Sequence, residues 1–169
     1  IIIITTIQMN KTYQNILSKT DFTPNTAWLQ IKTIDMHTGG EPLRVIIDGF
    51  PELKGNSVLE YRRYCKENFD YLRTALLFEP RGHTDMYGCI LVPPNNDEGD
   101  FGILFLHNEG YSTMCGHAII AISTLAIEMK WVAIKEGDNI LKIDAPCGRI
   151  TSFAHVKNGQ VTGVRFHCV

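Results

Sequence analysis

A cysteine and a histidine separated by one glycine are the residues of this chain whose types and spacing could do chemistry. The stretch at residues 110–120, GYSTMCGHAII, places Cys115, Gly116 and His117 where polar turn residues give way to an apolar run. A thiolate can accept a proton or attack a carbon atom. The stretch therefore indicates proton transfer or covalent chemistry.

The change from polar to apolar residues predicts that a helix begins here. Ser112 or Thr113 is a suitable N-cap, which would place Cys115 in the first turn. Free amides and the helix dipole at such a place attract anions, so we expect the pKa of Cys115 to lie below the ordinary value of about 8.5. One helix end could then supply a base and a carboxylate clamp, and Gly116 would allow a ligand close to the backbone. A buried, inert thiol is the alternative that spacing alone leaves open.

The elements around this stretch predict how it is held. Residues 118–129 are apolar in nearly every direction around a helix, so this helix must be buried. Residues 56–77 have apolar side chains at spacings of three and four, which predicts an amphipathic helix with Cys65 facing the core.

Runs of apolar or alternating residues predict strands on both sides of the apolar helix. They lie at residues 28–38, 43–50, 89–94, 101–107 and within 139–169, where Asn158-Gly159 is a hairpin signal. Cys89 and Cys168 lie in such runs and are interpreted as inert apolar residues. Together the elements predict an α+β fold, in which a curled mixed or antiparallel sheet wraps around a central buried helix.

Composition narrows the class of protein. The chain has 169 residues, 44% of them hydrophobic and 20% charged, which is the composition of one globular domain. A net charge of -2 with scattered lysine and arginine argues against a nucleic-acid partner. The five cysteines form no C-x-x-C pair, so we expect no disulfide framework and a reducing, cytoplasmic location.

The first residues, IIIITTIQMN, are apolar over too short a run to span a membrane. We treat residues 1–27 as a leader of uncertain status and expect the domain to begin at residue 28.

Two other chemistries are disfavoured by spacing. The chain has no H-E-x-x-H motif or paired cysteines, so His37, His83, His107 and His117 with Cys115 are not expected to form a metal site. A cysteine hydrolase using Cys115 and His117 is disfavoured because residues two apart on a helix do not face each other.

Three motifs carry a resemblance to a known family. The segments DMHTGGEPLR, EPRGHTDMYG and NEGYSTMCGHA resemble motifs of the proline racemase family, and they occur in the family's order between Asp35 and Ala118. The family includes proline racemases, 4-hydroxyproline epimerases and trans-3-hydroxy-L-proline dehydratases. The resemblance implies a cofactor-independent enzyme with a diaminopimelate-epimerase-like fold, in which an imino acid substrate binds between two similar lobes.

The resemblance also implies roles for particular residues. Cys115 would be the catalytic thiol of the first lobe, with Gly116 and His117 contacting the substrate. Tyr87 would line the pocket against the pyrrolidine ring. Possible homodimerisation is likewise implied by the family and by nothing else in the sequence.

A second catalytic group, cysteine or threonine, is implied in a second lobe. Because the chain ends at Val169, we expect residues 28–169 to form the first lobe only. The segment DAPCGRI superficially resembles the second catalytic motif, but a strand and hairpin follow it instead of an apolar helix. We interpret Cys147 as a turn residue, and its catalytic role stays a minority alternative.

The motifs look more like the dehydratases than the racemases. The favoured hypothesis is dehydration of trans-3-hydroxy-L-proline by the full-length enzyme. The alternatives are a proline racemase or 4-hydroxyproline epimerase, and a truncated, inactive lobe or interaction module.

Overall fold

The computed structural model describes residues 10–19 and 21–167, and the chain divides into two compact units, Ile1–Gln30 and Ile31–Val169. The first unit contains one helix, α1 (Lys11–Ser18), whose N-cap Asn10 accepts a hydrogen bond from the Thr12 amide. The sequence did not predict this helix, because no sustained apolar period marks it. The proposed boundary after residue 27 stays a prediction.

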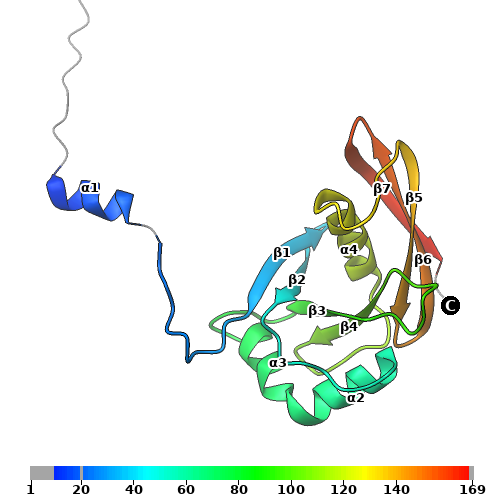
Figure 1. Cartoon of the computed structure of the whole chain (residues 1–169), viewed down its shortest axis with the longest axis horizontal. Helices are drawn as coiled ribbons and strands as arrows, with labels where there is room; N and C mark the ends of the chain where they lie inside the picture. The colour runs from blue at the N-terminus through cyan, green and yellow to red at the C-terminus, as the bar shows by residue number, and fades with distance from the viewer. Residues whose placement is uncertain (1–9, 20, 168–169) are drawn as a thin grey trace, which may run out of the picture. The chain divides into compact units, whose positions relative to one another are not determined.

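The second unit is built on one sheet of seven strands whose order in space is their order in the chain. The strands are β1 (Lys32–Thr38), β2 (Glu41–Asp48), β3 (Tyr87–Val92), β4 (Phe101–His107), β5 (Gly137–Ala145), β6 (Gly148–Lys157) and β7 (Gln160–His167). Neighbouring strands are antiparallel except for two parallel pairs, β2 with β3 and β4 with β5. The sheet is therefore mixed, and it curls (Figure 1).

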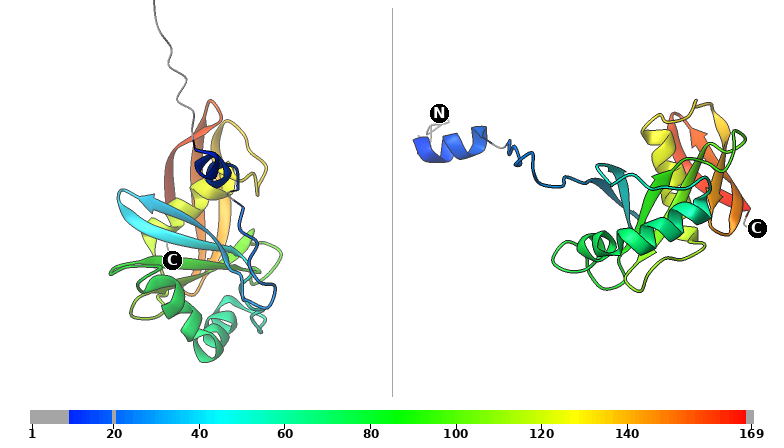
Figure 2. Two further views of the ribbon diagram at one scale, coloured as in Figure 1. Left: turned by 90° about the vertical axis from the view of Figure 1, so that its left-hand side faces the viewer. Right: turned by 60° about the horizontal axis from the view of Figure 1, so that its bottom comes forward.

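The two parallel pairs need helical crossovers. Helices α2 (Val58–Asn68) and α3 (Asp70–Leu77) connect β2 to β3, and α4 (Gly116–Glu128) connects β4 to β5. Strand β4 runs opposite to β2, so two crossovers of the usual right-handed sense that step in the same direction place their helices on opposite faces. Figure 2 shows this arrangement: α4 lies within the curl of the sheet, and α2 and α3 lie outside it.

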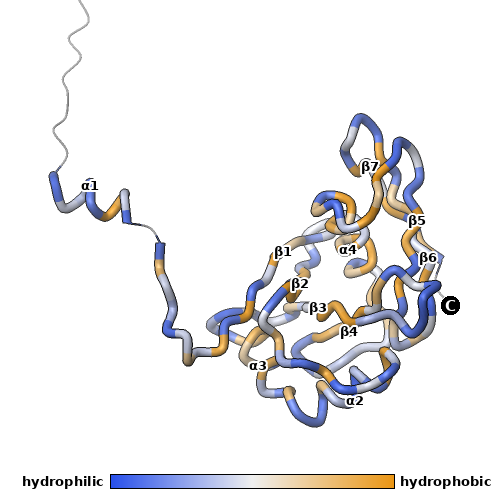
Figure 3. The backbone as a smooth tube through the Cα atoms, in the orientation of Figure 1, coloured by the Kyte–Doolittle hydropathy of each residue, from blue (hydrophilic) through white to orange (hydrophobic). Residues whose placement is uncertain are grey.

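Alternating residues of the central strands divide the core into two clusters. On β4, Ile103 and Phe105 pack in the cluster around α4, whereas Leu104 and Leu106 pack in the cluster beneath α2 and α3. Hydrophobic segments gather on the central strands and on α4, whereas the turns are mostly hydrophilic (Figure 3). Helix α4 has no polar face, as predicted; its buried residues are Ala118, Ile119, Ala121, Ile122, Ser123, Leu125, Ala126 and Ile127.

The predicted α+β fold, with a curled sheet around a buried helix, is confirmed. Strand β4 has its predicted bounds, and the hairpin at Asn158 and Gly159 is present, with positive φ values of 53° and 76°. Cys65 and Cys89 are fully buried, as expected, whereas Cys168 lies outside the described residues.

Two local predictions need correction. The single helix over residues 56–77 is two helices, because Phe69 leaves helical geometry with φ -130° and ψ 19°. The first strand begins at Lys32 and not at residue 28. Within the described part of the chain, no helix is long and apolar enough to cross a membrane.

Candidate active site

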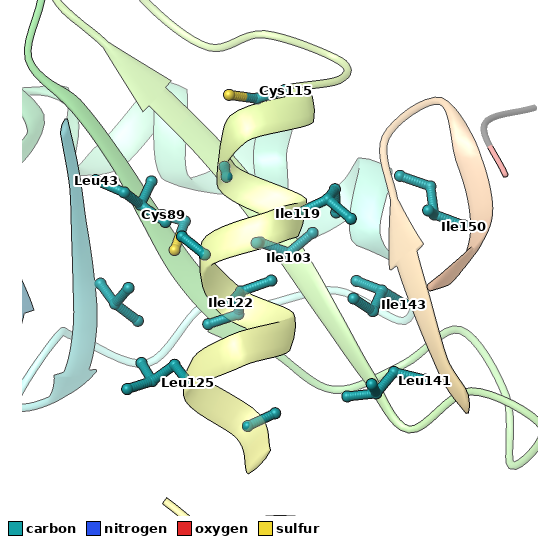
Figure 4. Packing of buried hydrophobic residues seen from close by; sticks show 14 of the residues in the cluster. Leu43, Cys89, Ile103, Cys115, Ile119, Ile122, Leu125, Leu141, Ile143 and Ile150 are labelled. Atoms are coloured by element: carbon teal, nitrogen blue, oxygen red, sulfur yellow. The ribbon is translucent and has the colours of Figure 1, made fainter. Parts of the chain in front are cut away.

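The start of α4 differs from its prediction. The helix begins at Gly116 and its N-cap is Cys115 itself, with extended backbone angles of φ -150° and ψ 109°. The predicted caps Ser112 and Thr113 precede the helix, and the Ser112 hydroxyl lies 3.5 Å from the Tyr87 hydroxyl instead of capping an amide. Cys115 therefore lies at the end of the buried helix and not within its first turn, as Figure 4 shows.

Burial has the largest effect on the pKa of the Cys115 thiol. Cys115 is only 6% exposed, and desolvation raises its pKa to about 11. A hydrogen bond from the Ala118 amide lowers the pKa, but this effect is smaller than the effect of burial, and the negative charge of Glu41 opposes it. The predicted low pKa is therefore wrong for this lobe by itself, because loss of water outweighs the field of the helix end.

The first amides of α4 are placed to meet a ligand. The first bond of the helical ladder runs from the Ile119 amide to the Cys115 carbonyl, at 3.1 Å. The amides of Gly116 and His117 lie before the first such hydrogen bond, and the helix contains no carbonyl that could accept from them. A Cβ atom added at Gly116 would be in van der Waals contact with the Phe166 ring, whose Cζ would lie 3.4 Å away, so the missing side chain lets this ring pack against the helix start.

His117 contacts the thiol, contrary to the expectation that residues two apart would not meet. The Cys115 sulfur lies 3.4 Å from Nδ1 and 3.6 Å from Nε2 of His117. The expectation failed because Cys115 has extended backbone angles, so its side chain does not follow the helical direction. An in-line N–H bond to one nitrogen would leave the other much farther away. The sulfur therefore lies side-on to the ring, which is not the in-line arrangement of a nucleophile and its base.

Tyr87 lies beside this pair. Its ring meets the His117 ring edge-on, with centroids 4.9 Å apart and planes at 80°. The Tyr87 ring also stacks with the His107 ring, with centroids 5.4 Å apart and planes at 28°. Tyr87 and His107 also line a hollow of about 560 Å³, which has the acidic residues Glu41, Asp85 and Glu109 on its wall.

The turn between β1 and β2 is tied to the start of α4. Thr38 donates a hydrogen bond from Oγ1 to the His117 carbonyl at 3.0 Å. Gly39 and Gly40 follow with φ values of 60° and 102°, a conformation that favours glycine and lets the chain reverse directly after Thr38. The first of the three sequence motifs is thus joined to the third.

Cys147 lies in the turn between β5 and β6, as predicted. Its amide donates to the Thr113 carbonyl at 3.1 Å, so the turn supports the loop that leads to Cys115. This contact was not predicted, because Thr113 and Cys147 lie in two loops that are far apart in the sequence and no spacing relates them.

Among residues 10–19 and 21–167, no three histidine, cysteine or acidic side chains lie close enough to hold a metal ion.

Comparison with known proteins decides the family. Residues 33–169 match the proline racemase family. This chain belongs to that family. It is 50% identical over 143 residues to a trans-3-hydroxy-L-proline dehydratase of Colwellia psychrerythraea, covering 85% of this chain and 40% of that protein. It is 48% identical over 140 residues to a trans-L-3-hydroxyproline dehydratase of Xenopus tropicalis, covering 82% and 40%.

Solved structures agree on the fold. A hydroxyproline epimerase from Agrobacterium vitis with bound trans-4-OH-L-proline superposes with a TM-score of 0.75 at 22% identity, covering 80% of this chain and 40% of that one. A probable proline racemase from Agrobacterium radiobacter K84 gives 0.76 at 27% identity, covering 81% and 41%. The chain thus spans about two fifths of the length of the relatives it matches.

The proline racemase motifs also contain supporting residues for which no role was predicted. Asp35 and Arg44 stand at the two ends of the first motif and form a paired ion bridge, with distances of 2.8 and 2.7 Å, that lowers the pKa of Asp35. Arg44 also donates to the carbonyls of Leu76 and Arg81, and so fixes the loop before Tyr87. The sequence pattern that could have predicted this pair is an acidic residue and an arginine on either side of a two-glycine turn. Such a turn favours a hairpin, in which the two residues lie on neighbouring strands.

Proposed function

We propose that this chain is the first lobe of an enzyme that dehydrates trans-3-hydroxy-L-proline without an organic cofactor, with Cys115 as the base at the α-carbon. The observation that carries the proposal is the position of the thiol. Cys115 lies at the N-terminus of a buried helix, against His117 and next to two amides that precede the helical ladder. The names of relatives about 50% identical to this chain support the choice of substrate.

The groups of this lobe suit the parts of such a substrate. The amides of Gly116 and His117 can hold its carboxylate, because anions bind at helix N-termini. The ring of Tyr87 offers an apolar wall to the pyrrolidine ring. The secondary ammonium of the substrate lies next to the α-carbon, and its positive charge would favour the thiolate of Cys115 over the thiol.

The reaction then balances as a loss of water. The thiolate takes the proton from the α-carbon, and the electron pair left there forms a double bond to the neighbouring carbon. The hydroxyl on that carbon leaves and receives a proton from an acid, which we assign to the second lobe. The product enamine tautomerises to Δ1-pyrroline-2-carboxylate. Preorganised amides in a site closed to water stabilise the charge that develops beside the carboxylate.

The proposal is tested by measuring turnover with a full-length protein, which contains this chain and is as long as its relatives. Trans-3-hydroxy-L-proline, L-proline and trans-4-hydroxy-L-proline are supplied in parallel, and products are separated on a chiral column. We expect Δ1-pyrroline-2-carboxylate from the first substrate only. Inversion of the α-carbon of either other substrate would instead support a racemase or epimerase, and no turnover of any substrate would support an inactive lobe or interaction module.

A homodimer and a cytoplasmic location stay predictions, which sedimentation and fractionation would test.

A further inference from the structure

The rings of His107, Tyr87 and His117 form a series of contacts between the end of β4 and the thiol of Cys115. His107 and Tyr87 are directly opposite each other on the antiparallel strands β4 and β3, and their rings stack with centroids 5.4 Å apart. Tyr87 meets His117 edge-on at 4.9 Å, and His117 lies 3.4 Å from the sulfur of Cys115. Each ring in this series therefore limits the position of the next.

Hydrogen bonds hold both the backbone and the ring of His107. Its amide and carbonyl both bond to Gly110, at 2.9 and 3.1 Å, and its carbonyl also accepts from the buried guanidinium of Arg73 at 2.9 Å. Its Nδ1 accepts a hydrogen bond from the Glu109 amide at 3.2 Å. Main-chain hydrogen bonds thus hold both the backbone and the ring of His107, with Nδ1 as the acceptor in the ring.

We infer that His107 is a positioning residue, whose ring holds Tyr87, and through it His117, in the orientation that the thiol of Cys115 requires. This inference rests on the proposed function, and it adds a residue outside the groups that touch the substrate. Aromatic pairs of this kind have energies that correspond to about two- to tenfold in an equilibrium. Small misplacements of groups near the reacting atoms are costly in rate, so a tenfold effect on turnover is reasonable.

A different role for His107 is to hold the turn at residues 107–110 through its Nδ1 acceptor. The two roles can be separated, because each depends on a different part of the side chain. Phenylalanine keeps a ring that can stack on Tyr87 but has no acceptor for the Glu109 amide. Asparagine keeps an acceptor at nearly the position of Nδ1 but has no ring.

The experiment compares His107→Phe with His107→Asn in the full-length protein. We expect His107→Asn to lower kcat/KM for trans-3-hydroxy-L-proline by about tenfold, and His107→Phe to stay within about twofold of the unmodified protein. In the background Tyr87→Leu, where no ring is left to position, His107→Asn should have little further effect. The opposite order of the two variants, equal losses in both, or an unchanged effect in the Tyr87→Leu background would overturn the inference.

A second measurement does not depend on turnover. The rate at which iodoacetamide alkylates Cys115, followed by mass spectrometry without substrate, reports on the surroundings of the thiol. We expect this rate to change in His107→Asn and to be unchanged in His107→Phe. If no hydroxyproline or proline is turned over, the proposed function fails, and the alkylation rates still decide whether His107 positions the rings. Equal alkylation rates in all three proteins would overturn the inference by themselves.

Discussion

The two faces of the sheet are held by different forces. On the α4 face, the helix buries apolar side chains around most of its circumference, and Cys115 lies at the edge of that cluster. On the other face, the apolar contacts are supplemented by two arginines, Arg44 and Arg73, which bind carboxylates and main-chain carbonyls. Apolar packing therefore places the helix that bears the thiol, whereas directional polar contacts fix the loops that approach it.

The hydrogen bonds of these arginines hold main-chain segments that lie next to the candidate site. Arg73 binds Asp70 through two nitrogens and donates to the carbonyls of His107 and Asn108. Main-chain carbonyls in loops need such partners when they lie away from water. The two arginines thus supply hydrogen bonds to main-chain carbonyls beside the candidate site.

The largest effect on stability is expected on the apolar face. Ile122 lies in the middle of α4 and is fully buried, so Ile122→Ala removes packed methyl groups and leaves a cavity. We expect the free energy of unfolding to fall by about 2–5 kcal/mol, measured by urea denaturation. Ile120 on the same helix is only partly buried, and Ile120→Ala should cost less. Equal losses in the two variants would mean that α4 is not enclosed as described.

A smaller effect is expected on the polar face. Arg73 as a whole residue is 7% exposed, and Arg73→Leu removes the four hydrogen bonds of its guanidinium and leaves the carbonyls of His107 and Asn108 without this donor. We expect a loss of about 2 kcal/mol, together with faster amide hydrogen exchange at residues 107–111. Arg63 on α2 is exposed, and Arg63→Leu is the matched control, with a change of at most about 0.5 kcal/mol. A loss in Arg73→Leu no greater than in this control would show that the arginine does not hold the turn.

The Cys115 thiol, at the edge of the apolar cluster, gives a prediction about pH dependence. Burial raises the pKa of Cys115 to about 11 in this chain, so the thiol is protonated at neutral pH and alkylation should accelerate as pH rises towards that value. In urea the apparent pKa should return to about 8.5, because the thiol regains water. The folded state binds the proton more tightly, so its stability should also decline as pH rises from the unfolded pKa towards 11. An alkylation midpoint in the folded chain below that in urea would show that the helix end outweighs burial.

Sequence reasoning succeeded where one local pattern determines the structure. The apolar run after Cys115 could form only an enclosed helix, and Asn158-Gly159 specified its hairpin through the positive φ angles that it tolerates.

Residues 56–77 were predicted to form one helix, although they form two, because both α2 and α3 present apolar residues to the same sheet. The period of the pattern therefore hides the break at Phe69.

Predictions about the site failed where they depended on contacts distant in sequence. Ser112 was a reasonable N-cap by type, but Tyr87 of a neighbouring strand lies beside its hydroxyl. The pKa of Cys115 was predicted from the helix end alone, without the burial that the curled sheet imposes. The stacking of His107 on Tyr87 required the strand register, which no spacing in the sequence specifies.

The central claim is that Cys115 is the base, and one measurement tests it directly. The full-length protein and its variants Cys115→Ser and Cys147→Ser are assayed for conversion of trans-3-hydroxy-L-proline, with far-UV circular dichroism as the check on folding. We predict that Cys115→Ser lowers kcat by about 10²–10⁴-fold, the usual contribution of a general base, and that Cys147→Ser keeps its activity. Conversion that survives in folded Cys115→Ser, or is lost in folded Cys147→Ser, would contradict this assignment.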